Sequence, residues 1–435
     1  MPARAFSCAA LVLVFAALAG GCGGSSEDPF KVAVLAFCDA RVSSLAFQQD
    51  RSDAGAELPF LRRGARLRGH APSAGVRDIS LAGRRVELLL GCAGFGNWAG
   101  DFDQVRRLVE DQGADAVVLP LSVGVGNALQ PYVRAHPDVT FFLTSPYEQT
   151  PTLKHPPANL FRFELDGAET SAGLGTYAYR TLGWRRAVTI GPFQPSDWTQ
   201  TAGFVAEFCA LGGDVVQRLW GFPGSPNYPA LVGQIRARGV DGVFFTGGVN
   251  GETTGLANAL RVRYPDLARH LLVGTFSLFF DPASSWLGVV GGSGIPYSSS
   301  SAAWRRYAAD LKRLTGEDSF LLDVTYFNQT EALLEALERV HGDTSHGERG
   351  LQHALARLHL ESPRGPITLD ARHQAVGETF LGRLERTKRG NLFVKQIRVV
   401  RNVEATFNGY FTPTSPPPSP TQPTCRHGNP PGWAR

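Results

Sequence analysis

Short apolar segments alternate with amphipathic ones along most of this chain, and the same order of elements occurs twice. Each apolar segment ends in a turn rich in Gly, Ser or Asn, and an amphipathic segment follows the turn. The first set comprises residues 31–37, 86–90, 116–121 and 139–143, and the second comprises residues 187–190, 214–219, 242–246 and 271–274. Such runs between helical stretches are typical of parallel strands buried on both faces. The pattern predicts an α/β protein with two doubly wound parallel-sheet lobes and a cleft that can hold a small molecule.

The segments between these strands predict helices, because their apolar residues recur on one helical face. In residues 103–111, for example, Val105, Leu108 and Val109 fall on the same side of a helix. Residues 380–384 and 392–400 instead predict a hairpin. The predicted helices comprise residues 57–68, 103–111, 127–135, 169–182, 198–211, 228–238, 301–314, 321–341 and 347–358.

The length of the chain, 435 residues, exceeds the roughly 250–300 residues at which a single hydrophobic core stops growing. We therefore expect two lobes, joined by a hinge of crossing segments near residues 156–165, 286–294 and 363–369. The expected parts are a signal peptide (1–21), a tether (22–30), lobe 1 (31–159 and 289–363), lobe 2 (160–288 and 364–411) and a proline-rich tail (412–435). Because proline lacks a backbone donor, the tail is expected to be an extended strap over the surface. The alternative is a proline-rich ligand for a partner protein.

The first residues of the chain predict export. Arg4 precedes an apolar run, residues 9–19, which is much shorter than the ~20 residues of a membrane span and is typical of a secretory signal. Residues 18–22 resemble a bacterial lipoprotein signal, in which Cys22 is lipidated and anchors the mature protein to the outer face of the cell membrane. The alternative is cleavage after Ala19, which gives a secreted or periplasmic protein.

Four further cysteines are consistent with an oxidising compartment, and four cysteines allow three pairings. Cys38 and Cys92 each follow one of the first two strands, so they are expected at the same edge of a sheet, where a disulfide could form. In the chain-entropy model such a bridge stabilises by roughly 4 kcal/mol. By elimination Cys209 would pair with Cys425 and fix the tail to a helix; the alternative for Cys209 is a buried free thiol.

Composition and motifs argue against several classes of function. The content of 43% hydrophobic and 19% charged residues is globular, and the net charge of +4, with scattered arginine pairs, does not indicate nucleic-acid binding. The Gly-x-Ser-x-Gly, His-Glu-x-x-His and Cys-x-x-Cys motifs are missing from the sequence. The histidines between His341 and His359 lack the spacing of a metal pair. We therefore expect neither an enzyme nor a metal or cofactor site.

The strongest candidate for a binding site is the turn at residues 121–127. Ser122 and the segment Gly124-Val125-Gly126 would let several backbone amides point toward a carboxylate or carbonyl group. The alternative is that the glycines only close a tight turn. Leu129 stands where a dinucleotide fingerprint requires a third glycine, so a nucleotide site is not indicated.

Other turns at strand ends offer further contacts, because ligands of open α/β sheets bind beyond the carboxyl ends of the strands. Residues 144–150 supply hydroxyls, an amide side chain and an aromatic wall. In the opposite lobe we expect contributions from residues 195–198, 247–252 and 275–277. Trp198 would either stack on a ligand or belong to the core at a helix start.

Three stretches carry a resemblance to a known family: residues 158–163, 236–245 and 360–367. Together with the order of elements from about Lys31 to Gly409, they resemble the leucine/isoleucine/valine-binding proteins. These are the type I periplasmic binding proteins that serve ABC importers. The resemblance implies two lobes that close like a hinge on a small molecule, followed by delivery to a membrane permease.

The resemblance also implies site residues. In that family the turns that match residues 122–127 and 145–149 hold the α-carboxylate and help to hold the ammonium group. Two departures, Phe276 in place of an acidic residue and Val249 in place of a tyrosine, favour an aromatic or less polar ligand with one carboxylate or amide. The expected ligand contacts are Ser122, Gly124, Val125, Gly126, Tyr147, Gln149, Trp198, Asn250 and Phe276. An extracellular sensor of the same fold, acting on a signalling receptor, is the alternative function.

Overall fold

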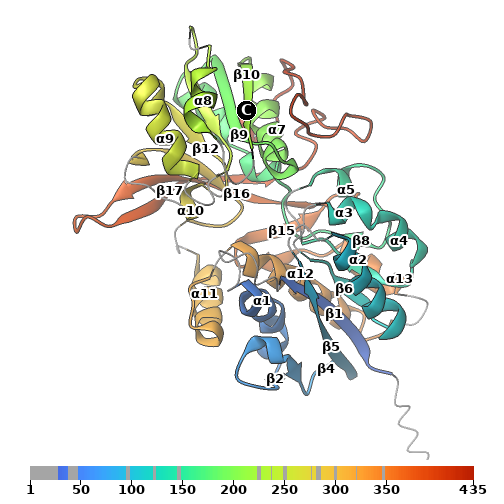
Figure 1. Ribbon diagram of the computed structural model, residues 1–435. Helices are drawn as coiled ribbons and strands as arrows, with labels where there is room; N and C mark the ends of the chain where they lie inside the picture. Colours follow the sequence, from blue (N-terminus) through green and yellow to red (C-terminus); the bar gives the residue numbers. More distant parts are fainter. Residues whose placement is uncertain are drawn as a thin grey trace, which may run out of the picture.

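The structure is a computed structural model that describes residues 28–37, 48–94, 98–120, 124–144, 148–222, 227–236, 238–247, 252–275, 277–280, 286–297, 301–319, 321–344 and 348–435. Figure 1 shows two lobes, each a sheet with helices on both faces, connected by segments that run between them. The predicted α/β class with two doubly wound lobes is confirmed.

The first lobe contains a six-stranded sheet in the order β4-β5-β1-β6-β7-β8. Strand β1 (Phe30–Phe37) lies in the middle and pairs in parallel with β5 and β6, because its alternate residues are apolar on both faces. The short strand β4 pairs antiparallel to β5 at the edge. The other strands are β4 (Ser80–Leu81), β5 (Arg84–Ala93), β6 (Ala116–Val118), β7 (Thr140–Phe142) and β8 (Leu160–Phe161).

The second lobe contains a nine-stranded mixed sheet in the order β10-β9-β11-β12-β13-β16-β15-β14, with β17 paired to β16. Its parallel part comprises β9 (Arg186–Pro192), β10 (Asp214–Gly221), β11 (Gly242–Phe245), β12 (Leu271–Val273) and β13 (Val290–Ser293). Its antiparallel part comprises β14 (Leu360–Ser362), β15 (Gly365–Leu369), β16 (Ala375–Arg386) and β17 (Leu392–Val403). The long pair β16–β17 is the predicted hairpin.

The helices follow the predicted order with several differences. The helix at Glu252–Arg263 was not predicted, and the predicted helix 127–135 is divided into Val125–Ala128 and Gln130–Ala135. Helix α1 (Gln48–Arg62) begins nine residues before its predicted start at Glu57, since its first half is rich in polar residues and gave no apolar periodicity. The predicted helix 169–182 is broken into short turns, because Gly173 has a φ of +89° and its amide donates to the Glu207 carboxylate. The first-lobe helices are α1, α2 (Trp98–Arg106), α3 (Val125–Ala128), α4 (Gln130–Ala135), α5 (Thr150–Leu153), α11 (Ala302–Thr315), α12 (Leu321–Arg339) and α13 (Arg349–Ala356). The second-lobe helices are α6 (Leu174–Thr176), α7 (Pro195–Ala210), α8 (Tyr228–Gly233), α9 (Glu252–Arg263) and α10 (Ser277–Phe280).

Three strands join a different sheet from the one implied by the expected lobe boundaries. Leu360–Ser362 was expected in lobe 1, but it pairs with β15 in the second sheet. Leu160–Phe161 was expected to open lobe 2, but it pairs with β7 in the first sheet. Val290–Ser293 was expected in lobe 1, but it pairs with β12 and β16 in the second sheet. Strand β8 is apolar at both positions and β13 is rich in glycine, so their sequences do not indicate which sheet they join. The first two crossings therefore lie a few residues later in the chain than expected, and the third lies a few residues earlier.

Charged side chains are buried where the chain passes between the lobes. Glu164, in the first crossing segment, forms an ion pair with Arg364 in the third. The side chains of this pair are 1% and 2% exposed. A Cβ atom built on Gly294, in the second crossing segment, would lie 3.6 Å from Nη1 of Arg364 and 3.9 Å from Oε1 of Glu164. The three crossing segments therefore meet at one buried ion pair.

The tail is an extended strap on the second lobe, as predicted. The indole of Trp220 donates to the carbonyl of Pro420 at 3.0 Å, and the hydroxyl of Tyr410 donates to the carbonyl of Thr424 at 2.8 Å. The ring of Trp433 packs edge-on against Phe407. Within the described ranges, no helix combines the length and the apolar character that crossing a bilayer would require.

Candidate functional site

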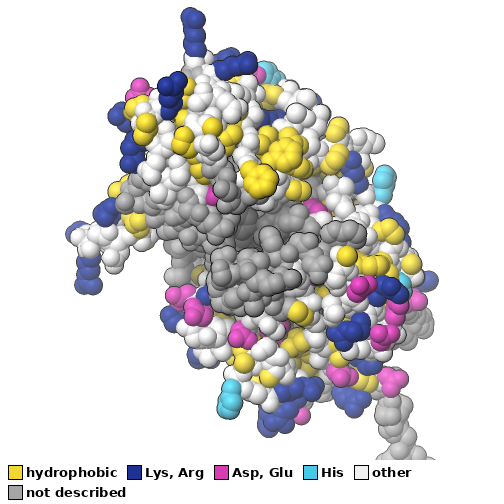
Figure 2. All heavy atoms as spheres, viewed as in Figure 1, with side chains coloured by type: hydrophobic (Ala, Val, Ile, Leu, Met, Phe, Trp, Pro, Cys, Tyr) yellow, Lys and Arg dark blue, Asp and Glu magenta, His cyan; other side chains and the backbone are white. Residues whose placement is uncertain are grey.

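The turns singled out in the sequence follow the carboxyl ends of parallel strands in both sheets. In the first lobe they lead from β6 to α3 and from β7 to α5; in the second they lead from β9 to α7, from β11 to α9 and from β12 to α10. Figure 1 places α3, α5 and α10 near the level at which the lobes meet. Figure 2 shows the described Lys and Arg side chains mainly toward the outer ends of this face. The carboxyl ends of the strands are where open α/β sheets bind ligands.

The glycine turn after β6 has a backbone shape that requires glycine. Gly124 has a φ of +90°, which side chains other than hydrogen rarely tolerate. A Cβ atom on Gly126 would lie 2.8 Å from Cγ of Pro151 and 3.3 Å from a carboxylate oxygen of Glu148. The two glycines therefore permit a close approach of the β6 turn to the β7 turn.

An internal carboxylate already lies against this turn. Glu148 is only 8% exposed, and one of its oxygens accepts a hydrogen bond from Nδ2 of Asn127 at 3.2 Å. Burial raises the pKa of the Glu148 carboxyl, while hydrogen bonds from the backbone amides of Gly124 and Asn127 and the charge of Arg162 oppose that rise. Some of the amides expected to receive a ligand are thus directed at a side chain of the protein itself.

Gln149 is buried beside this carboxylate, and its Nε2 donates to the carbonyl of Ala405 at 2.9 Å. Ala405 follows β17 in the second lobe, so this predicted contact residue bridges the first-lobe turn to the C-terminal part of the chain. Thr144, at the end of β7, donates to the carbonyl of Leu119. The bond from Thr144 to Leu119 joins the ends of β6 and β7.

In the second lobe Trp198 lies in the first turn of α7, and it is neither fully buried nor fully exposed. Its ring packs edge-on against Phe193, with centroids 5.0 Å apart, and Phe193 is 53% exposed. The indole nitrogen of Trp198 makes no hydrogen bond to the described residues. The pair offers an aromatic wall, as the interpretation of Trp198 as a stacking residue requires.

Two acids lie at the same edge of this lobe, within the expected segments 195–198 and 247–252, although neither was named as a ligand contact. Asp197 is 2% exposed and its Oδ2 accepts hydrogen bonds from Gln194 Nε2 at 2.6 Å and from Ser196 Oγ at 2.9 Å. Burial raises the pKa of Asp197 to about 6, although hydrogen bonds to the carboxylate act in the opposite direction. Glu252, the first residue of α9, is 3% exposed. Acidic residues directly after Gly- or Pro-containing turns were the signal that could have identified them.

The remaining second-lobe turns are held by side-chain hydrogen bonds. Gln200 on α7 accepts from the backbone amide of Thr275 at 2.9 Å, and Ser277 donates to the carbonyl of Gly247 at 2.9 Å. The hydroxyl of Thr275 is buried and has no hydrogen-bond partner among the residues that the structure describes. It is therefore a polar group available for a contact at this edge.

Several predicted residues cannot be placed. Ser122, Tyr147, Asn250, Phe276, Cys22 and Cys38 lie outside the described residues, and for Val125 only the backbone is described. The signal peptide (1–21) and all but the last residues of the tether also lie outside them. Their assigned roles stay predictions.

For Cys209 the sequence left two options, and the structure has the disulfide to Cys425. It fixes the tail to the last turn of α7. Cys92 is also a disulfide cysteine. Its pairing with Cys38 stays a prediction.

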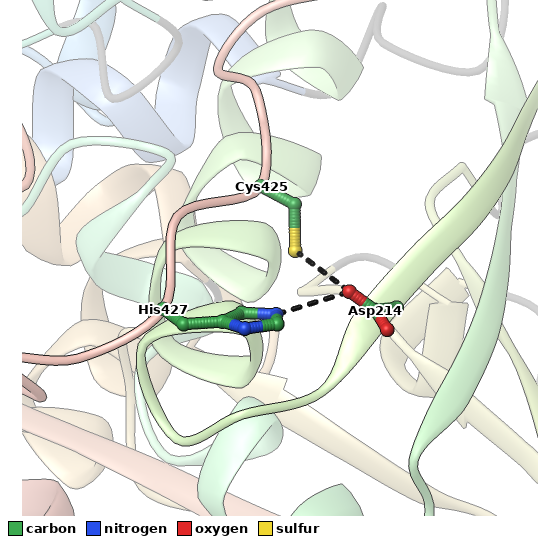
Figure 3. Close-up of side chains that lie close together, drawn as sticks. All are labelled: Asp214, Cys425 and His427. Carbon is green, nitrogen blue, oxygen red and sulfur yellow. Dashed lines mark hydrogen bonds and ion pairs between the residues drawn. The ribbon is translucent and has the colours of Figure 1, made fainter.

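One group of potential metal ligands lies beside the disulfide (Figure 3). Oδ1 of Asp214 is 3.0 Å from Nε2 of His427 and 3.9 Å from Sγ of Cys425. A metal would need the thiolate of Cys425, which the disulfide removes. The two ligands that remain are fewer than the three or four protein ligands of a typical zinc site. This group therefore fastens the tail to β10.

Comparison with known proteins agrees with this architecture. A family model described as "Periplasmic binding protein" matches residues 70–391, well over half of the chain. The chain belongs to the periplasmic binding protein family. Membership places it among extracytoplasmic binding proteins of transport systems. A search of curated proteins gave no match.

Solved periplasmic binding proteins share the fold at low sequence identity. An ABC transporter substrate-binding protein from Sphaerobacter thermophilus is 18% identical, with a TM-score of 0.75, over 87% of this chain and 99% of the other. A Rhodopseudomonas palustris solute-binding protein in complex with 3,4-dihydroxybenzoic acid is 18% identical, with a TM-score of 0.70, over 87% and 99%. LivJ from Streptococcus pneumoniae in complex with isoleucine is 15% identical, with a TM-score of 0.64, over 85% and 100%. At these identities the likeness concerns the fold.

Proposed function

We propose that this protein is the solute-binding component of an ABC importer, which captures a small molecule between its lobes and delivers it to a membrane permease. The observation that supports this most strongly is the opposition of two sets of βα turns, one from each sheet, in a chain whose lobes are joined by crossing segments. Neither set of turns encloses a ligand alone. A ligand that contacts both sets would stabilise the closed arrangement by the difference between its affinities for the closed and the open state.

The solved relatives indicate the size and type of cargo. Their bound molecules include benzoate, 3,4-dihydroxybenzoic acid, 4-hydroxybenzoate and isoleucine. The exposed Phe193 beside Trp198 supports a cargo with an apolar or aromatic part. We propose an amino acid or a related carboxylate or amide, held by the turns that contain Ser122, Gly124–Gly126, Tyr147, Gln149, Asn250 and Phe276. The chain needs no cofactor for this and performs no chemical reaction on the cargo.

The proposal includes export and a lipid anchor on Cys22, which would hold the protein near its permease. Mass spectrometry of the protein from its membrane would detect the acyl chains on Cys22. A Cys22→Ser variant would then be released in soluble form.

A ligand screen tests the binding function. Any compound that binds the folded protein raises the melting temperature in proportion to ln(1 + [L]/Kd). We expect at least one amino acid, aromatic acid or amide to produce such a shift and to make the protein more compact in small-angle scattering. A ligand bound without compaction would contradict hinge closure, and chemical conversion of the ligand would contradict the absence of enzymatic activity.

A further inference from the structure

Glu148 occupies a position that a ligand carboxylate would otherwise take. A Cβ atom built on Gly126 would lie 3.3 Å from an oxygen of the buried carboxyl group of Glu148, which also accepts a hydrogen bond from Asn127. The backbone amides of Gly124 and Asn127 also act on it. The glycine turn therefore already holds one anion, supplied by the protein.

The other turns at the carboxyl ends of the strands reinforce this negative charge. Asp197 and Glu252 are buried at the edge of the second sheet. The turns that follow β5, β6, β7, β9, β11 and β12 contain no Lys, Arg or His over residues 94–105, 119–133, 143–153, 193–217, 246–260 and 274–304. Two other segments at this edge contain a basic residue. The turn after β1 contains Arg41, which lies outside the described residues, and the segment after β8 begins with Arg162, whose Nη1 donates to the backbone carbonyl of Glu148 at 2.6 Å.

A second carboxylate at the glycine turn would be close to Glu148. The one nearby guanidinium among the described residues, that of Arg162, is already shared by four acids: Glu148, Glu164, Asp166 and Glu169. Like charges brought together in a desolvated site strongly disfavour binding. A primary amide or an amine instead donates hydrogen bonds, which the Glu148 carboxylate can accept.

We propose that Glu148 is a specificity-determining residue that makes the site select cargo with an amide or amine group over the corresponding carboxylic acid. This inference rests on the proposed function, and it narrows the cargo from the wider class given there. The inferred cargo differs from the acids bound by the solved relatives.

Matched acid and amide pairs provide the test. Benzoate and benzamide, phenylacetate and phenylacetamide, and leucine and leucinamide are titrated into the purified full mature chain by calorimetry at neutral pH. We expect wild type to bind an amide at least about tenfold more tightly than its acid. Glu148→Gln removes the charge at nearly constant size, so it should reduce this preference about tenfold or more by gaining affinity for the acid. Glu148→Asp keeps the charge and should keep the preference.

Glu110→Gln is the matched control, because it removes one carboxylate from a half-exposed surface ion pair of the same lobe. It should leave the preference unchanged. The inference is overturned if wild type binds an acid as tightly as its amide, a measurement that needs no variant. If Glu148→Gln binds acids that wild type rejects, the inference is supported even where no amide of the panel is the cargo. If neither protein binds any member of the panel, the binding function itself is contradicted, and this inference with it.

Discussion

Removing one partner of the buried Glu164–Arg364 ion pair should destabilise the whole molecule strongly. Both side chains are almost completely buried, and the second oxygen of Glu164 accepts a hydrogen bond from Thr325 of α12 at 2.8 Å. Glu164→Gln would leave the guanidinium of Arg364 without a charge partner in a dry environment. Breaking a buried pair in this way typically costs about 3–5 kcal/mol, whereas exposed pairs contribute about 0–1 kcal/mol.

Urea unfolding followed by circular dichroism measures this cost in a double-mutant cycle of Glu164→Gln, Arg364→Met and the double variant. We expect each single variant to lose about 3–5 kcal/mol, and the double variant to lose clearly less than the sum, because it buries no lone charge. Arg401→Met is the control, since Arg401 pairs with Glu378 but its side chain is 73% exposed; its effect should stay within about 0.5 kcal/mol. Additive losses in the double variant, or a Glu164→Gln variant within about 1 kcal/mol of wild type, would show that the pair is not a coupled buried ion pair.

Three further predictions concern stability. Burial raises the pKa of Glu57 to about 9, so the folded state keeps a proton that the unfolded state releases above its ordinary pKa of 4.5. The free energy of unfolding should therefore fall as the pH rises between these two values, by up to about 1.4 kcal/mol per pH unit. Urea unfolding of Glu57→Gln should show a flatter dependence on pH. Cys425→Ser should cost about 2–5 kcal/mol and expose the tail to proteases, which mass spectrometry of a limited digest would show. Gly203→Ala should destabilise far more than Gly233→Ala, because its Cβ would lie 2.1 Å from a backbone oxygen whereas Gly233 has open space; similar melting temperatures would contradict this.

The elements that the sequence predicts well are those whose own composition determines them. Strand β1 was expected at residues 31–37 and is observed at Phe30–Phe37, since an uninterrupted apolar run has no alternative to burial in a parallel sheet. The hairpin of β16 and β17 was predicted from two apolar-rich segments that flank a short polar turn. The disulfide of Cys209 to Cys425 was one of two options that counting the cysteines left open, and the structure has it.

The features that sequence reasoning missed depend on contacts between distant segments. Glu164 and Arg364 are separated by 200 residues, and each lies in a stretch that reads as an ordinary strand or turn. Glu148 was read as one polar residue of a turn, because only its approach to Gly126 shows that it lies against the amides of the β6 turn. The sheet that β8 and β13 complete also depends on which edge is free after the other strands have paired. None of this has a local signature.

The position of the ion pair constrains how the proposed closure can occur. Closure requires the crossing segments to change their backbone angles. Separating Glu164 from Arg364 would cost about 3–5 kcal/mol. That cost is about half of the ~8 kcal/mol that the binding of a micromolar ligand supplies. A low-affinity cargo could not bear that loss. The rotation must therefore take place in residues on either side of the pair, with Glu164, Gly294 and Arg364 moving as one rigid unit. On this argument the pair keeps the three crossing segments in register in both the open and the closed state.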